Sequence, residues 1–420
     1  MSSPDQRKRG IVVLLANSGL MSAGFFMLIP LLSVHLTRDL GFSGAAAGVV
    51  LALRQITQQG LMLFGGALAD RIGYRPVIAA GMLVRSLGFF GFGLGDSLPV
   101  ILISAIVAAL GGALFEATGK AALASLAPPE ERPRLFSLSS LAGGAGSTVG
   151  PLLGVVLLPY SFALVGVASG AFFFVAFALS TVLLPPLTGA AAGEQAPPLG
   201  QTLRAIARHR PFLVFTALLT GYWFLHNQLY IAVPLRAVQV TGSANTVGLL
   251  YAVTAIAGLA LQYPLVRLLA TRISPAAAVG VGVGVMGTGL GLMAFATAGE
   301  TALPIMLASM VVFAAGRAVA EPMKDVVTAS LAPAAALAAF FGVAFLALAV
   351  GGSAGNFAGG WLFDVATASG AYALPWVIFA VLGIVVAIGL AGFTRHAAAA
   401  AASTRVPAPT DVAAPVRGIP

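Results

Sequence analysis

The chain has 420 residues, of which 59% are apolar and 8% are Asp, Glu, Lys or Arg, whereas about a quarter of an ordinary soluble domain is charged. This balance excludes a water-soluble fold, and the absence of cysteine excludes disulfides, thiolate metal sites and cysteine nucleophiles. The formal net charge of +9 does not indicate nucleic-acid binding, because the cations are scattered between apolar runs and form no basic face.

Twelve apolar runs follow one another along the chain, separated by charged residues or by proline and glycine. Each is long enough for a helix that crosses a bilayer, which takes about 20 residues. An outer-membrane barrel is excluded, because it needs polar and apolar residues in alternation and residues 135–193 carry no charge. We therefore predict an all-α polytopic membrane protein with helices at 11–35, 43–66, 76–95, 98–127, 135–158, 161–186, 211–236, 243–268, 274–298, 301–328, 336–362 and 371–393.

Lysine and arginine are unevenly distributed between the two sides of these helices. Fifteen lie in the N-terminus, the even-numbered loops and the C-terminus, against two, Arg38 and Arg236, in the other loops. Because the excess of Lys and Arg marks cytoplasmic loops, we predict a multi-pass protein of the cell (inner) membrane with both termini in the cytoplasm. Residues 1–10 and 187–210 are then a cytoplasmic N-terminus and linker, and residues 394–420 a disordered cytoplasmic tail.

The two halves of the chain, 11–186 and 211–393, are related by an internal repeat. A shift of 205 positions superimposes Ala124–Pro128 on Ala329–Pro333, at the end of the fourth helix of each half. Parallel repeats of this kind place a central pathway at their interface, near the middle of the bilayer. We therefore predict two pseudo-symmetric six-helix bundles.

The loop after the second helix carries a motif rich in glycine and arginine. Residues 66–76 read G-A-L-A-D-R-I-G-Y-R-P, the pattern G-x-L-x-D-R-x-G-x-[RK]-P. It resembles the motif of the major facilitator superfamily (MFS). We expect a cytoplasmic latch, in which the acid accepts from a helix N-terminus and the arginines bind carboxylates or lipid phosphates; a positive-inside turn without specific contacts is the alternative. The gate residues would be Gly66, Asp70, Arg71, Gly73 and Arg75, together with Lys324 and Asp325.

Three more segments narrow this resemblance: Leu53–Gly60, Ala320–Pro322 and Gly359–Asp364. Together they resemble the MdtH-type branch of bacterial multidrug-resistance transporters. The resemblance implies efflux of organic compounds from the cytoplasm, driven by proton entry. The P-loop pattern G-x4-G-K-[ST] does not occur, so the chain gives no support to ATP hydrolysis.

The fifth helix contains a second motif, formed by Gly146, Gly150, Pro151 and Gly154. It resembles the glycine-proline motif of MFS antiporters, although Ser137 replaces its first glycine and Val155 its last. Small residues four apart allow close helix contact, and the proline bends or stiffens the helix where the halves meet. A plain packing face fits these residues equally well.

Eight charged side chains fall inside the predicted helices, where charge is costly unless it is paired or faces water. Glu116 lies about 16 Å from the cytoplasmic helix end, at 1.5 Å per residue, and the repeat superimposes Glu321 on it. We predict that these two acids carry protons, because burial favours the protonated carboxyl and nearby cations favour the carboxylate. Static ion pairs that fix helix register are the alternative. The cations in question are Arg54 and Lys120 near Glu116, Arg317 and Lys324 near Glu321, and Arg85, for which we expect a structural role.

Aromatic and amide side chains of the first and seventh helices predict a substrate pocket, since these helices line the central cavity in the MFS arrangement. Its members would be Asn17, Phe25, Phe26, Tyr222, Asn227, Gln228 and Tyr230. Trp361 and Trp376 are expected in the lipid-facing aromatic belt, and His226 as a packing residue.

Taken together, the residues and the resemblance predict a monomeric secondary transporter that works by alternating access, with no enzymatic activity, cofactor or metal. Proton-coupled antiport of a small organic substrate out of the cell is our first interpretation, with protons and membrane lipids as the other partners. Import or facilitated diffusion of an organic anion or another nutrient is one alternative. A lipid-handling or sensor protein on the same fold is the other.

Overall fold

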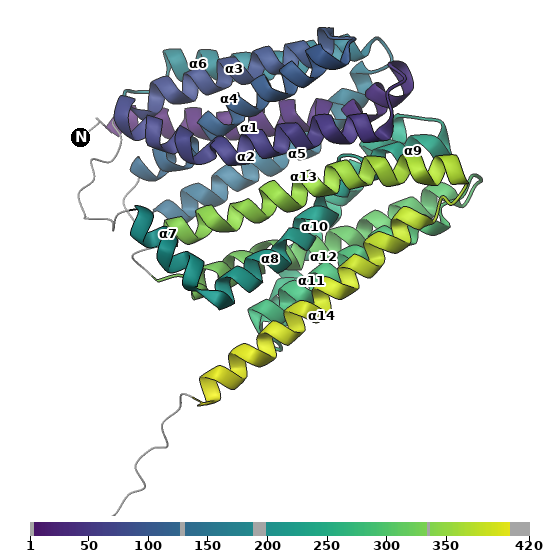
Figure 1. Ribbon diagram of the computed structural model, residues 1–420. Helices are drawn as coiled ribbons and strands as arrows, with labels where there is room; N and C mark the ends of the chain where they lie inside the picture. The colour runs from purple at the N-terminus through teal and green to yellow at the C-terminus, as the bar shows by residue number, and fades with distance from the viewer. Residues whose placement is uncertain (1–3, 127–130, 188–198, 334–336, 404–420) are drawn as a thin grey trace, which may run out of the picture.

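The computed structural model describes residues 4–126, 131–187, 199–333 and 337–403, and within these ranges the chain forms helices and no strand (Figure 1). The longer helices are α1 (Pro4–Val34), α2 (Gly44–Ile72), α3 (Tyr74–Leu94), α4 (Leu98–Ser125), α5 (Arg132–Leu157), α6 (Phe162–Val182), α7 (Leu199–Arg208), α8 (Arg210–His226), α9 (Ala232–Thr241), α10 (Asn245–Ala270), α11 (Pro275–Leu292), α12 (Ala302–Leu331), α13 (Leu337–Ser369) and α14 (Leu374–Ser403). Three single turns, η1 (His35–Asp39), η2 (Asn227–Leu229) and η3 (Met293–Phe295), adjoin α1, α8 and α11.

Among the described residues, ten helices are long and apolar enough to cross a membrane. The two other predicted spans are α2, where Arg54 and three glutamines lower the hydropathy, and the seventh. The seventh is interrupted at η2, which divides it into α8 and α9. Both run alongside the ten (Figure 1). The all-α polytopic fold is therefore confirmed, and the count of twelve spans stays a prediction.

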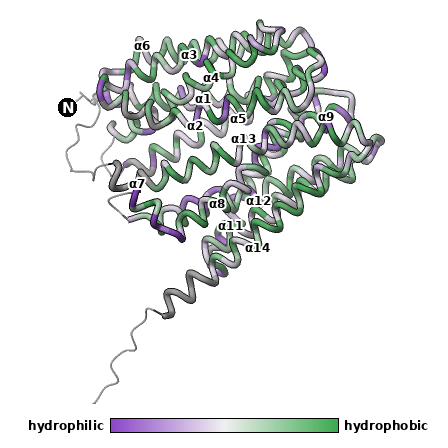
Figure 2. Tube along the Cα trace, viewed as in Figure 1, coloured by the Kyte–Doolittle hydropathy of each residue, from purple (hydrophilic) through white to green (hydrophobic). Residues whose placement is uncertain are grey.

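The outer surface is apolar along most of the helices (Figure 2). Large side chains such as Phe64, Ile103, Val156 and Ile388 are exposed there. A soluble protein would bury most of these groups, whereas lipid tails are as apolar as the side chains themselves. The exposed apolar surface is thus the face expected toward lipid.

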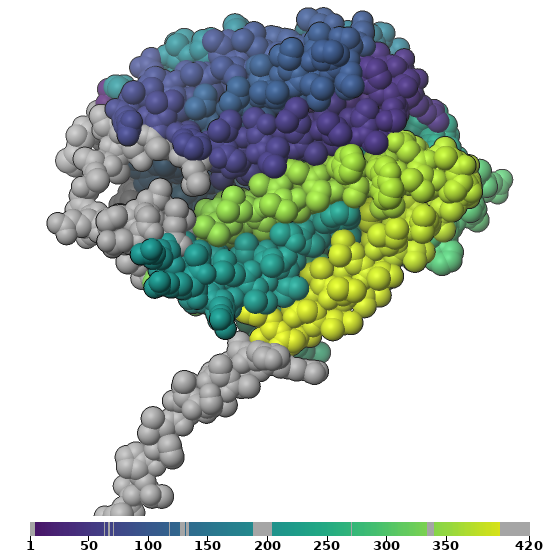
Figure 3. Space-filling view, in the orientation of Figure 1, coloured from purple at the N-terminus to yellow at the C-terminus, as the bar shows by residue number. Residues whose placement is uncertain are grey.

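The helices form two groups that lie one above the other in Figure 1. In the first, α1 packs on α5 and α6, and α3 packs on α4 and α6. In the second, α11 packs on α12 and α14, and α8 packs on α13. Between the groups, α2 lies against α13 and α5 lies against α10, and Figure 3 shows the first of these contacts.

The glycines of the α5 motif face α1. An added Cβ would lie 2.9 Å from the backbone nitrogen of Ala23 at Gly146, and 3.1 Å from that of Met27 at Gly150. The carbonyl oxygen of Pro151 points elsewhere, toward Gly248 on α10 of the second group. The glycines therefore permit close packing within one group, as small residues do between membrane helices, while the proline lies where the groups meet.

The chain enters α1 and leaves α14 on the same side of the molecule, which we call the terminal face; the opposite side, where α9 lies, is the distal face (Figure 1). Toward the distal face the two groups are hydrogen-bonded to each other. Asp364 at the end of α13 accepts from the backbone nitrogens of Gly44 and Ala45, both at 2.7 Å. These are the first amides of α2, where a carboxylate also meets the positive end of the helix dipole.

Two further contacts join the groups on this side. Arg38 donates from Nη2 to the carbonyl oxygen of Val238 at 2.8 Å, and Ser353 donates to that of Ala52 at 3.1 Å. Beside Asp364 the backbones touch, since a Cβ added to Gly44 would lie 2.7 Å from the carbonyl oxygen of Gly360. The distal face is therefore closed.

Two helical segments differ from the predicted linker and tail. Within the linker, α7 forms a short helix whose Ile206 packs with Phe212 and Phe340. Beyond residue 394, α14 continues to Ser403 because the chain there is rich in alanine, the strongest helix former. This first part of the expected disordered tail is thus helical, and residues 404–420 lie outside the described residues.

Candidate functional site

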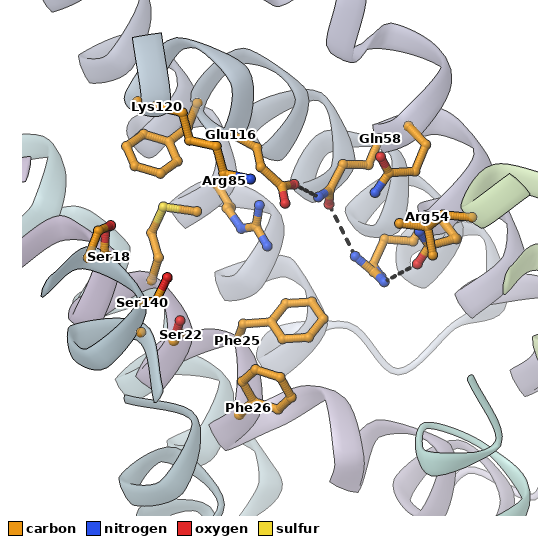
Figure 4. A pocket seen from close by; sticks show the side chains of 18 of the residues that line it. Ser18, Ser22, Phe25, Phe26, Arg54, Gln58, Arg85, Glu116, Lys120 and Ser140 are labelled. Atoms are coloured by element: carbon orange, nitrogen blue, oxygen red, sulfur yellow. Dashed lines mark hydrogen bonds between the residues drawn. The ribbon is translucent and has the colours of Figure 1, made fainter. Parts of the chain in front are cut away.

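A cavity of about 390 Å³ lies between the two groups of helices (Figure 4). Its walls come from α1, α2, α3, α4 and α5 on one side and from α8, η2 and α13 on the other. Leu14, Leu123 and Ser139 line it toward the terminal face, and Lys120 on its rim is exposed. The cavity therefore opens in the direction opposite to the closed distal face.

A second cavity, of about 320 Å³, adjoins the first and lies between α1 and α5 of the first group and α8, α10 and α12 of the second. It contains Arg317 and Glu321 of α12. Four side chains line both cavities: Phe26, Trp223, His226 and Tyr230. The two cavities are thus neighbouring lobes of one central site, separated by aromatic rings.

A chain of hydrogen bonds connects Arg54 with Glu116 in the first lobe (Figure 4). Arg54 donates to the side-chain oxygen of Gln58 at 3.2 Å, and Gln58 donates from Nε2 to Glu116 at 2.7 Å. Arg54 also donates to Gln55 at 3.1 Å. Glu116 lies nine residues before the end of α4, so it sits about 14 Å deep at 1.5 Å per residue.

Glu116 has no cation within 4.0 Å in the described part of the chain. Lys120, expected beside it one helical turn later, is instead exposed at the cavity rim. A long lysine side chain gains more from hydration than from an exposed ion pair. Glu116 is therefore held by a neutral amide.

Arg85 lines the first lobe, although the sequence favoured a purely structural role for it. It is 4% exposed, and its Nε and Nη1 have no hydrogen-bond partner. Its guanidinium carbon lies 5.6 Å from the ring centre of Phe25 and 5.1 Å from that of Phe173. A single charged residue in an apolar run gives no sign of the face on which it lies, so the sequence did not reveal this contact with the cavity.

Glu321 has different surroundings from Glu116. Lys324 lies 3.1 Å from its carboxylate, and Tyr222 donates its hydroxyl to it. Lys324 also contacts Asp325 at 2.9 Å and lies over the ring of Trp223 at 5.4 Å. Arg317, predicted beside Glu321, lines the same lobe but makes no ion pair within 4.0 Å among the described residues.

The structure brings together part of the expected substrate pocket. Phe25, Phe26, Asn227 and Tyr230 line the first lobe, with Trp223 and His226 beside them. Phe25 and Tyr230 form an edge-to-face pair with centroids 6.1 Å apart, the geometry that aromatic rings prefer. These residues make the apolar wall of the cavity.

Three residues expected in the pocket lie outside both lobes, because the side chain of each one forms a hydrogen bond with a neighbouring helix. Asn17 donates to Ser180 of α6 at 2.8 Å, and Gln228 donates to the carbonyl oxygen of Gly355 at 3.0 Å. Tyr222 is fully buried against Glu321. The expectation that Trp376 faces lipid was wrong: its side chain is 2% exposed and packs edge-to-face on Phe379. Trp361 is exposed, as expected.

The contacts described around the predicted latch lie within the first group of helices. Gly73 has φ +94°, a conformation that glycine adopts without strain, and so reverses the chain between α2 and α3. The backbone nitrogen of Tyr74 donates to Leu187 at 3.0 Å, and Arg75 donates to the carbonyl oxygen of Thr181 at the end of α6. Arg71 is exposed. The surroundings of Gly66 and the side chain of Asp70 lie outside the described part of the chain.

The sequence model of the Major Facilitator Superfamily matches residues 14–242, more than half of the chain. The chain belongs to the major facilitator superfamily. It is 35% identical over 393 residues to "Multidrug resistance protein MdtH" of Cronobacter sakazakii, covering 91% of this chain and 94% of that protein. The protein of the same name from Sodalis glossinidius is 36% identical over 397 residues, with 93% and 95% covered. This MFS member is therefore a multi-pass membrane transporter, homologous to proteins named for multidrug resistance.

Solved structures show the same fold. The POT family transporter PepTSo superimposes with a TM-score of 0.75 at 16% identity, over 94% of this chain and 99% of that one. A bacterial homologue of the human lysosomal transporter Spinster, described as inward-facing and occupied, gives 0.76 at 14% identity over 94% and 98%. Homologues and structural neighbours of this MFS chain are transporters and not enzymes.

Proposed function

We propose that this chain is a proton-coupled antiporter that exports organic compounds by alternating access. The observation that carries the proposal is the position of Glu116: a deep carboxyl, inside a cavity between the two helix groups, held by Gln58 and, among the described residues, by no cation within 4.0 Å. Such a group can take up or release a proton without breaking an ion pair. An ionisable side chain at this depth is costly in free energy, and its presence there therefore favours a functional role.

The arrangement of the faces supports alternating access. The groups are bonded to each other at the distal face by Asp364 and Arg38, while the cavity opens toward the terminal face. We propose that residues 11–186 and 211–393 rock against each other around the cavity, as parallel repeats do in such transporters. The excess of Lys and Arg on the terminal face supports a cytoplasmic position for that face. A single copy of the chain encloses both lobes, which supports a monomer acting alone in the cell membrane.

The names of the relatives support the direction of transport, since both are called multidrug resistance proteins. One observation favours the second candidate function, transport of an organic anion: Arg54 and Arg85 lie in the first lobe with a single acid, Glu116. An importer would accumulate the anion inside, whereas an exporter would remove it. The sign of the flux therefore separates the two functions.

The test uses the purified chain in proteoliposomes with an imposed pH gradient and a pH-sensitive dye in the lumen. A lipophilic cation, a neutral apolar compound and an aromatic carboxylate are added in turn. We expect protons to move opposite to the transported compound. Co-movement of protons with the carboxylate would establish the importer, and absence of any proton movement would contradict proton coupling.

A matched control is available in the second group. Arg267→Gln changes an exposed charge near the end of α10, outside both lobes, and should transport as the unmodified chain does. Loss of transport in that variant would indicate a general effect of charge on folding or orientation in the vesicle.

A further inference from the structure

Arg85 is an unsatisfied cation within the cavity wall. Its Nε and Nη1 are buried without a hydrogen-bond partner, and no carboxylate of the described residues lies within 4.0 Å of it. The rings around it orient the guanidinium, because its carbon lies 5.1 Å from Phe173, 5.6 Å from Phe25 and 5.9 Å from Phe89. Cation–π contacts offset only part of the cost of burying a charge without a counter-ion.

Arg54 shares one of these rings. Its guanidinium carbon lies 5.0 Å from the ring centre of Phe25, against 5.6 Å for Arg85. Two of its nitrogens donate to Gln55 and Gln58, and its Nε has no partner. Figure 4 shows both guanidinium groups next to Phe25. Two buried arginines thus leave donors unused beside a single aromatic ring.

The acids of the cavity do not balance these charges. The charged side chains that line the two lobes are Arg54, Arg85, Glu116, Lys120, Arg317 and Glu321. Glu321 is already paired with Lys324, which leaves Glu116 as the one acid of the lining that faces Arg54 and Arg85. The remaining positive charge favours an anion, and guanidinium groups bind carboxylates with strong charge-assisted hydrogen bonds.

We infer that the space beside Phe25, between Arg54 and Arg85, binds the carboxylate of an aromatic or apolar organic acid. The apolar body of that ligand lies against Phe26, Trp223 and Tyr230, which line the cavity next to the arginines. The inference rests on the proposed function only in taking this cavity as the substrate site. It adds the chemical class of the substrate.

The first experiment compares three ligands of one shape on the unmodified full-length chain in nanodiscs of neutral lipid. The probes are 9-anthracenecarboxylate, its neutral carboxamide and the corresponding 9-anthracenylmethylammonium. Trp223 lines both lobes, so energy transfer from tryptophan to the anthracene ring measures binding. We expect the carboxylate to bind about tenfold tighter than the amide or more, since a hydrogen bond to a charged group contributes about 1.5–3 kcal/mol, and the ammonium to bind weakest. Equal binding of all three, or tightest binding of the ammonium, would overturn the proposal.

The second experiment assigns the preference to the arginines. Arg54→Gln and Arg85→Gln should each lower affinity for the carboxylate about tenfold, the loss of one charge-assisted contact, and leave the affinity for the amide unchanged. Arg85→Lys keeps the charge without the planar fork and should restore part of the loss. Arg267→Gln, outside the cavity, should behave as the unmodified chain. Parallel loss of all three ligands in both Arg85 variants would mean that Arg85 maintains the fold and does not bind the ligand.

Binding is measured without any gradient, so its outcome is independent of proton coupling. A preference for the carboxylate without proton-driven transport would leave the subsite standing and refute the antiporter. Proton-driven export of neutral or cationic compounds without this preference would refute the subsite alone. Short-chain phosphatidic acid is added as a competitor. If micromolar phosphatidic acid displaces the carboxylate probe, and the probe itself binds only at higher concentrations, the arginines bind a lipid headgroup and the proposed substrate class is wrong.

Discussion

Glu116 on α4 and Glu321 on α12 occupy equivalent positions in the two halves of the chain, yet their carboxylates have different partners. Glu116 accepts from the amide of Gln58 at 2.7 Å, whereas Glu321 lies 3.1 Å from Lys324 and also accepts from the hydroxyl of Tyr222. The first acid is held by neutral groups and the second by a cation.

This difference shows that equivalent positions of a sequence repeat can have different surroundings in the two halves. A proton that binds Glu116 breaks no ion pair within 4.0 Å among the described residues. A proton that binds Glu321 must first compete with Lys324, which stabilises the carboxylate. We therefore expect the two acids to divide their roles, with proton exchange at Glu116 and a structural ion pair at Glu321.

The largest effect should come from Glu116→Gln, which keeps the shape of the side chain and removes the proton-binding site. We expect proton movement coupled to substrate to fall to the level of vesicles without the protein. Transport down a substrate gradient should survive without its dependence on pH. Lumenal pH and substrate flux in proteoliposomes measure both quantities.

Glu321→Gln is the matched variant for this comparison, since it makes the same chemical change at the equivalent position. It should retain substrate-coupled proton movement, at a lower rate. If Glu321→Gln abolished coupling and Glu116→Gln preserved it, the assignment of roles would have to be reversed.

The next effect, on stability, is expected for Lys324→Gln. Breaking a fully buried ion pair costs about 3–5 kcal/mol, and we expect about 1–3 kcal/mol here because Glu321 faces a cavity. Thermal unfolding in detergent should show a lower midpoint, and Lys324→Arg, which keeps the charge, should restore most of it. An unchanged midpoint in Lys324→Gln would show that the ion pair does not hold α12.

A smaller effect is expected for Tyr222→Phe, which removes one hydrogen bond to Glu321 and leaves the ring in place. A hydrogen bond to a charged group contributes about 1.5–3 kcal/mol, and Lys324 remains to stabilise the carboxylate, so we expect a loss near the lower end. The same unfolding assay measures it. In a variant that combines Tyr222→Phe with Lys324→Gln, the loss of unfolding free energy should differ from the sum of the two single losses, because both groups contact the same carboxylate. A loss equal to that sum would show that the two contacts act separately.

The smallest effect should follow from Lys120→Gln. Exposed side chains outside special contacts change stability by less than about 0.5 kcal/mol, and Lys120 is exposed at the cavity rim. We expect an unchanged unfolding midpoint and unchanged proton coupling. A large loss of coupling in this variant would place Lys120 beside Glu116 in another state of the transport cycle.

The fold could largely be predicted from the sequence, because long apolar runs bounded by charge leave few structures other than membrane helices. The interruption of the seventh span at Asn227 was not predicted. A short 3₁₀ turn replaces the helix there, and Pro234 in the first turn of α9 has no backbone N–H to donate to Tyr230 four residues earlier. Asn227 and Gln228 at the break are polar, but apolar residues on both sides make the whole run long enough to be predicted as one span.

The site could be predicted only in part. Residue type and depth within the predicted helix were enough to predict that Glu116, Phe25 and Tyr230 line the cavity, because charged and aromatic side chains are conspicuous inside a membrane helix. The rotation of each helix decided the rest: Asn17 turns toward α6 and Arg85 toward the cavity. A helix that is apolar on every side has no hydrophobic face in its sequence pattern, so the sequence does not predict which side chains turn toward the cavity.

Gly44 and Gly360 meet main chain to main chain, so the seam between the groups leaves no room for a side chain at Gly44. A methyl group added there would lie 2.7 Å from the carbonyl oxygen of Gly360 and would force the two helices apart. Variants that change how readily the distal face opens, without such a clash, are therefore expected at Asp364, whose carboxylate ties α13 to the first amides of α2.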